Sequence, residues 1–250
     1  MKIEFTPHHA VADIFPPEPI KKYIPEWYKK LPGHIPFKDP HDIVNLGAKK
    51  DVKRCVPVLD YMTSGYVIRA QCDIVLTRDL DPKDKTCERI RSYAHMQEKF
   101  GLELIGGHGN SQFPIEVRGV KKQTLKFNNY YHIKTPPGYS CMFYQPFYLL
   151  ESCFTVLPGI VDTDKHTECI NFPFFLQDQP DEEFRIDIKA GDPLVCVLPY
   201  KRDNWSSKFN PSERNENGDQ LVPVSKARLK FNAIMDYAYK NLFHSKKRFD

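Results

Sequence analysis

The sequence has no long apolar run. No stretch approaches the roughly 18 consecutive apolar residues of a membrane-spanning helix. The first ten residues, MKIEFTPHHA, contain no apolar core of a secretory signal. We therefore expect a cytoplasmic protein that makes no contact with a membrane.

The sequence also lacks paired metal-ligand or disulfide motifs. None of its seven cysteines forms a CxxC pair, and their number is odd. Several lie among apolar residues, where a free cysteine behaves as a small hydrophobe. His108, His132 and His166 have no local HxH or HxxxH spacing. We expect reduced thiols and no metal site built from these residues.

A strong excess of one charge is missing as well. The formal net charge is +4, which is too small to imply nucleic acid as a partner. The charge is uneven, because seven Lys or Arg follow Ser225 against only Asp236 and Asp250. Two interpretations of this basic end remain: a solvated helix face, or a contact with phosphate or an acidic partner.

Proline, in contrast, is abundant, with 21 residues. Because proline is excluded from helix interiors and central strand positions, short strands with structured connections are favoured. Between residues 131 and 199, apolar runs recur about every ten residues and are separated by turn motifs such as Pro158-Gly159 and Ala190-Gly191-Asp192. This spacing predicts a mainly β protein, a sandwich or barrel of short strands.

The pattern divides the chain into three parts. Residues 1–54 form a proline-rich N-terminal arm with one short helix near 18–31, anchored by Trp27, which covers its own barrel or clasps a neighbouring subunit. Residues 55–200 form the barrel domain, with a strand over 66–76 and a helical insertion near 86–101. Residues 201–250 form a polar loop and a basic amphipathic helix that Ser225 caps.

Two segments resemble a known fold family. They are FTVLPGIVDTD, residues 154–164, and FRIDIKAGDPLVCVL, residues 184–198. They are similar to the Gly-x-Ile-Asp-x-Asp turn and the closing hairpin of the dUTPase and dCTP deaminase group. The resemblance implies a β-clip, that is, a jelly-roll-like barrel.

The chain as a whole resembles a family of uncharacterised proteins of tailed phages and some bacteria. The shared features include Gly-His-Gly at 107–109, Thr-Pro-Pro-Gly-Tyr at 135–139, Asn-Phe-Pro-Phe at 171–174 and Ala-Gly-Asp-Pro-Leu at 190–194. The resemblance implies a phage-related origin, and then a location in the host cytoplasm or the virion. It carries no function over.

The candidate catalytic residues are Asp162, Asp164 and His108. In dUTPase-like sites the residue equivalent to Asp162 is a general base, and metal-bound phosphates neutralise the charge. Mg²⁺ is therefore the implied cofactor if the chain is such an enzyme. The alternatives are structural: an aspartate that stabilises its own turn, and a histidine that caps a glycine hairpin.

Several departures from the dUTPase pattern favour a protein without catalysis. Lys165-His166-Thr167 stands where an aromatic-Arg-Gly is expected, and Thr-Pro-Pro-Gly-Tyr-Ser at 135–140 replaces the phosphate loop and its arginine. Tyr139, Lys165 and Arg202 are the remaining candidates for ligand binding.

We therefore predict a non-enzymatic, oligomeric binding or structural protein, whose partner is itself or another protein. The alternative is a divergent dUTPase-like enzyme that binds or hydrolyses a nucleotide-like small molecule with Asp162 as base.

Overall fold

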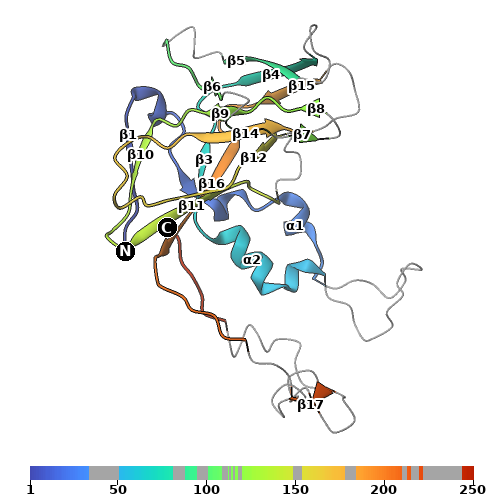
Figure 1. Ribbon diagram of the computed structural model, residues 1–250, viewed down its shortest axis with the longest axis vertical. Coiled ribbons are helices and arrows are strands. Elements are labelled where there is room, and N and C mark those ends of the chain that lie inside the picture. The colour runs from blue at the N-terminus through green and yellow to red at the C-terminus, as the bar shows by residue number, and fades with distance from the viewer. Residues whose placement is uncertain are drawn as a thin grey trace, which may run out of the picture.

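The computed structural model describes residues 1–33, 51–80, 88–94, 101–108, 112, 114, 116–117, 120–148, 154–177, 184–209, 213–214, 220–221 and 244–250. Its centre is an antiparallel five-stranded sheet in the order β13-β11-β16-β3-β2 (Figure 1). The strands are β2 (Glu18–Pro19), β3 (Tyr66–Arg69), β11 (Tyr139–Tyr144), β13 (Gly159–Val161) and β16 (Pro193–Lys201). Alternation along β11 and β16 sends apolar side chains to both faces of this sheet.

One face of the five-stranded sheet packs on a four-stranded sheet in the order β12-β14-β9-β6. That sheet contains β6 (Ile105–Gly107), β9 (Leu125–Phe127), β12 (Phe154–Val156) and β14 (Phe172–Leu176). Phe143 of β11 contacts Phe172 of β14 at 5.3 Å between ring centroids, which joins the two layers. Phe174 stacks on Phe127 at 4.0 Å within the second layer. The main core therefore lies between two sheets, as in a sandwich.

A third sheet continues the first around a corner. It has the order β15-β4-β5 and contains β4 (Ile74–Leu80), β5 (Glu88–Ala94) and β15 (Phe184–Ile188). The pairs β3·β16 and β4·β15 are parts of one ribbon, which bends where residues 70–73 face residues 189–192. Gly191 takes φ of 88° there, its N–H donates to Ala70 O at 2.8 Å, and Ala70 N–H donates to Asp192 O at 2.9 Å. The glycine thus permits the corner.

The N-terminal residues are part of the folded body. β1 (Glu4–Pro7) pairs with β10 (Tyr131–Lys134), and β2 extends the five-stranded sheet beside β3. The 3-10 helix η1 (Ala10–Asp13) lies between them. The Gln71 side chain accepts from Phe15 N–H at 3.1 Å and donates to Phe15 O at 2.8 Å, so it pairs with the backbone as a strand would.

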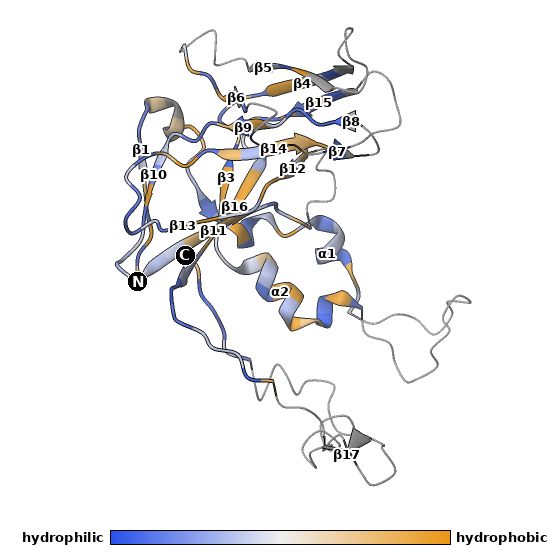
Figure 2. Ribbon diagram, in the orientation of Figure 1, coloured by the Kyte–Doolittle hydropathy of each residue, from blue (hydrophilic) through white to orange (hydrophobic). Residues whose placement is uncertain are grey.

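The second face of the five-stranded sheet is covered by short helices, which lie below it in Figure 1. They are η2 (Ile20–Tyr23), α1 (Glu26–Lys30), η3 (Val52–Arg54) and α2 (Val56–Thr63). Ile20 and Tyr61 pack against Tyr144 and Cys196 of the sheet. Figure 2 shows the apolar strands β3 and β16 at the centre between these layers. Two small hairpins complete the described elements: β7 (Glu116–Val117) with β8 (Val120–Lys121), and β17 (Glu213–Arg214) with β18 (Gln220–Leu221).

The prediction of a mainly β protein is confirmed. No sheet closes into a barrel within the described ranges, so the β-clip or jelly-roll barrel stays a prediction. The strand predicted over 66–76 is two strands, since the ribbon bends at 70–73. The helix predicted near 18–31 is divided between β2, η2 and α1, and Pro25 stands at the N-cap of α1. No helix was predicted where α2 lies, at Val56–Thr63.

The helix predicted near 86–101 is wrong for residues 88–94, which form β5. The apolar spacing of Ile90, Tyr93 and Ala94 fits a helix, but β4 pairs with all seven residues of β5, and Ile90 turns into the core at 8% exposure. Tertiary pairing outweighs local pattern here. The helix predicted to follow Ser225 lies outside the described residues. The structure describes the chain again from His244 onward.

Candidate functional site

Three strand ends meet at one edge of the five-stranded sheet. Cys141 of β11 is in register with Val161 of β13 on one side and with Pro199 of β16 on the other. Because both neighbours are antiparallel to it, β11 begins where β13 and β16 end. The turn before β11, the turn after β13 and Arg202 after β16 therefore gather at one place.

Asp164 is the most enclosed member of this cluster, with its side chain 5% exposed. Arg202 donates to its two carboxylate oxygens at 2.7 and 2.5 Å, and Gly138 N–H donates to Oδ2 at 2.8 Å. Gly138 takes φ of 84°, which favours glycine at this turn. The hydrogen bond from Arg202 holds the pKa of Asp164 far below its usual range. At neutral pH, Asp164 is therefore an enclosed carboxylate that holds Arg202 through charged hydrogen bonds.

Asp162 is more accessible, with its side chain 51% exposed. Ser140 Oγ donates to its Oδ1 at 2.7 Å, and Arg202 Nη1 lies 3.1 Å from the same oxygen. The hydrogen bond from Ser140 lowers the pKa of Asp162, and Arg202 lowers it further. The N–H groups of Lys165 and His166 donate to the backbone oxygen of Asp162 at 2.9 Å, so the side chain is free of the turn's own N–H groups. It ties the turn to β11 instead.

The interior of the turn is fully bonded. Thr163 is 0% exposed, and its hydroxyl lies 2.7 Å from the hydroxyl of Thr135 and 3.4 Å from Cys141 Sγ. Lys134 Nζ donates to the backbone oxygen of Asp164 at 2.7 Å. Burial raises the pKa of the Cys141 thiol to about 11, so it is not a thiolate nucleophile at neutral pH.

The structure brings five of the six predicted site residues together. Asp162, Asp164 and Arg202 form the network, and Lys165 follows it on the exposed side of the turn. Tyr139 takes part through its backbone oxygen, which accepts from Arg202 Nη1 at 3.1 Å. His108 does not belong to this cluster: it follows β6 of the other layer, where its Nδ1 lies 2.7 Å from Gln112 Oε1.

Ser140 is the residue that the sequence did not single out. Its hydroxyl donates to Asp162 and accepts from Arg202 Nη1 at 3.0 Å, at 0% exposure. The Pro-Pro-Gly turn marked the start of β11, and Ser140 is the second residue of that strand. Its partners are 22 and 62 residues away, a separation that no local motif encodes.

The residues of this network bond mainly to one another. Arg202 contacts the carboxylates of Asp162 and Asp164, and the hydroxyl of Ser140 donates to Asp162 and accepts from Arg202. Asp162 is a poor base because its pKa is lowered, and Ser140 is a poor nucleophile because it is buried and bonded. Within the described ranges, no group of three or more His, Cys, Asp or Glu side chains is placed to hold a metal ion.

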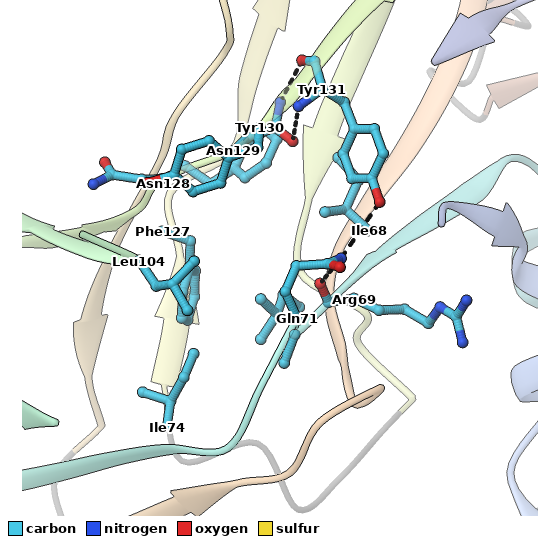
Figure 3. A pocket seen from close by; sticks show the side chains of 13 residues that line it. Ile68, Arg69, Gln71, Ile74, Leu104, Phe127, Asn128, Asn129, Tyr130 and Tyr131 are labelled. Carbon is cyan, nitrogen blue, oxygen red and sulfur yellow. Dashed lines mark hydrogen bonds between the residues drawn. The ribbon is translucent and has the colours of Figure 1, made fainter. Parts of the chain in front are cut away.

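The described cavities lie away from this network. A hollow of about 740 Å³ lies between the N-terminal segment and the outer face of the β15-β4-β5 sheet, with Phe15, Cys72, Tyr93 and Arg185 among its lining residues. A core cavity of about 30 Å³ lies beside Gln71, Asn129 and Tyr131, whose side chains are hydrogen bonded (Figure 3). Neither includes Asp162, Asp164 or Arg202.

A scan against models of known protein families found no match, and a search of curated proteins found no similar sequence. Among the helices of the described residues, none is both long and apolar enough to cross a membrane.

Proposed function

We propose that the protein is a non-enzymatic binding or structural protein of β-clip type and phage-related origin, which acts by associating with further copies of itself. The observation that carries the proposal is a cluster of aromatic side chains over the helices, called the aromatic face, in which Trp27 and Phe147 are exposed. It consists of Trp27, Tyr61, Phe147 and Tyr148, and the buried Tyr28 contacts Trp27 from the same helix.

The aromatic face joins two helices to the chain after β11. Tyr148 lies 6.3 Å from the ring of Trp27, 5.2 Å from that of Tyr61 and 5.3 Å from that of Phe147. Trp27 is 37% exposed and Phe147 is 67% exposed. Aromatic residues are enriched in the cores of protein interfaces, and an exposed apolar patch marks an interaction site.

The closed network at Arg202 supports a role without catalysis. A general base needs an accessible lone pair and a pKa near the working pH. Asp162 has a lowered pKa, and Asp164 is enclosed. What the network supplies is a rigid junction between β11, β13 and the end of β16.

One observation favours the second candidate, a dUTPase-like nucleotide-handling enzyme. Asp162 keeps half of its side-chain surface exposed beside Arg202, and Oδ2 takes no hydrogen bond from the described residues. In that reading Asp162 and Asp164 stand at the position of the acidic turn, and Mg²⁺ with a nucleotide would bind over Asp162.

Light scattering coupled to size exclusion tests the proposal. We expect a mass of at least two chains at micromolar concentration. A thermal-shift screen with nucleotides and Mg²⁺ tests the second candidate, because a ligand at 100 times its Kd stabilises a protein by about 2.7 kcal/mol. We expect no shift. A monomer at every concentration contradicts the proposal, and nucleotide hydrolysis that Asp162→Asn abolishes establishes the alternative.

A further inference from the structure

One edge of the three-stranded sheet is open. β15 (Phe184–Ile188) is the outer strand in the order β15-β4-β5, so one side of its backbone pairs with β4 (Figure 1). In the described part of the chain, no strand lies on its other side, and no hydrogen bond reaches the backbone groups there. A row of unpaired N–H and C=O groups is a template for a further strand.

Other sheet edges are closed by the chain itself. On β5, the outward N–H of Ile90 donates to Gln123 Oε1 at 2.6 Å. On β12, the N–H of Val156 donates to Gln145 Oε1 at 2.8 Å. Strand β2 has only two residues and ends in proline, which has no N–H to donate. β15 has five residues and neither of these devices, so its edge is the one prepared to pair.

The side chains of β15 alternate between core and solvent. Ile186 and Ile188 are buried at 5% and 4% exposure. The side chains of Arg185 and Asp187 are 64% and 39% exposed on the outer face. Arg185 donates to both carboxylate oxygens of Asp187, at 2.9 and 2.8 Å. The outer face of this edge therefore carries one cation, followed two residues later by one anion.

This charge pattern is complementary to itself. A two-fold axis perpendicular to the sheet pairs two copies of β15 antiparallel and keeps their buried faces on the same side. With the axis at Ile186, all five residues of each strand pair, and Arg185 of each copy lies opposite Asp187 of the other. With the axis at Arg185 or at Asp187, two like charges lie opposite each other, which is destabilising. A slip by one residue would turn the buried face outward.

We propose that two copies pair β15 edge to edge about Ile186, so that their two three-stranded sheets form one six-stranded sheet. This inference rests on the proposed self-association and adds a contact separate from the aromatic face. A foreign strand of uniform charge would repel either Arg185 or Asp187. A second copy of β15 supplies both opposite charges in the one register that pairs the whole strand, so the charges select it as the occupant.

An exchange of charges tests the contact. Arg185→Glu and Asp187→Arg each place two pairs of like charges opposite each other across the axis, so each should raise the dimer Kd at least about 10-fold in analytical ultracentrifugation. An equimolar mixture should recover the wild-type affinity as a mixed dimer, because one strand then carries two anions and the other two cations. The matched control is Lys201→Glu, which breaks the exposed ion pair of Lys201 with Asp203 and should leave Kd unchanged.

Two further measurements separate the contact from the fold. The melting temperature of each variant, at a concentration where the protein is monomeric, should lie within about 2 °C of the wild type, because an exposed ion pair contributes little to stability. Hydrogen exchange of the wild type should slow in the peptide that contains β15 as the concentration crosses Kd. The peptide that contains β5 should show no such change.

The outcomes distinguish this contact from self-association as such. A wild-type dimer whose Kd responds to neither variant, and whose β15 exchange is independent of concentration, overturns the edge pairing and leaves self-association standing. Weakened variants that do not recover when mixed overturn the pairing as well, since the charges then do not meet across the axis. A wild-type protein that is monomeric at all concentrations overturns both proposals.

Discussion

Asp162 and Asp164 stand two residues apart and have opposite surroundings. The side chain of Asp164 is 5% exposed, and that of Asp162 is 51% exposed, although both contact Arg202. Removing one charge of a buried pair leaves the other without compensation, whereas an exposed pair contributes little. The same substitution should therefore have unequal effects at the two positions.

We predict that Asp164→Asn lowers the melting temperature by at least about 5 °C, because Arg202 and Gly138 N–H lose a charged acceptor. Asp162→Asn, the matched control, should lower it by no more than about 2 °C. Thermal unfolding followed by circular dichroism at pH 7 measures both. Equal losses would mean that the burial of Asp164 has no energetic consequence.

The pH dependence of stability should identify the same residue. The pKa of Asp164 lies below its ordinary value of 3.8 in the folded protein, so its stabilising contribution is fully present above that value and is lost as the pH falls toward the folded pKa. The difference in melting temperature between wild type and Asp164→Asn should be constant from pH 7 to about 5 and shrink below about pH 4. A difference that stays constant down to pH 3 would assign the loss to packing.

At the scale of elements, local motifs predicted the strands and distant contacts decided their grouping. Most strands between 131 and 199 were predicted because turns bound them, as Pro136-Pro137-Gly138 bounds β11. β13 was not, since it begins at Gly159 inside the predicted turn Pro158-Gly159 and pairs with β11. β5 could not be found in this way, since its partner β4 determines its conformation. The bend at 70–73 depends on Gly191, about 120 residues later. Only part of the candidate site could be predicted from the sequence. The two aspartates belong to one local motif, whereas Ser140 and Arg202 come close to them through the register of β11 with β13 and β16.

The core of the four-stranded sheet gives an element-scale prediction. Phe174 is 0% exposed and stacks on Phe127, so Phe174→Ala should cost about 3–5 kcal/mol of unfolding free energy. Ile160→Ala on the edge strand β13 is the control, because Ile160 is 62% exposed, and it should change stability by less than about 0.5 kcal/mol. Urea denaturation measures both. A loss below about 1 kcal/mol for Phe174→Ala would contradict the stacked core.

For the whole molecule, the thiols report on global unfolding. Cys55 is exposed and Cys169 is partly exposed, whereas Cys72, Cys141 and Cys196 are buried. Burial raises the pKa of the Cys196 thiol to about 12, which further slows its reaction. The three buried thiols belong to the core that joins the sheets and to the helix-covered face.

We predict that a thiol reagent labels Cys55 within minutes at neutral pH, Cys169 more slowly, and the three buried cysteines only in denaturant. Mass spectrometry of peptides from labelled protein measures the order. The buried sites should react together across the urea transition, because Cys72 and Cys141 share one core and Cys141 and Cys196 lie on the paired strands β11 and β16. Early labelling of Cys141 alone would show that the Arg202 junction opens before the rest.

The chain that departs at Arg202 is also tied down where it returns. His244 and Lys247 lie 2.9 and 2.8 Å from the Asp60 carboxylate of α2, and Asp250 lies 2.7 Å from Lys21 Nζ. These contacts therefore attach residues 244–250 to α2 and η2 of the body. They join residues that are 184 and 229 positions apart in the chain. Because contacts at such separations require long loops to close, they form at a high entropic cost and slow the completion of the fold.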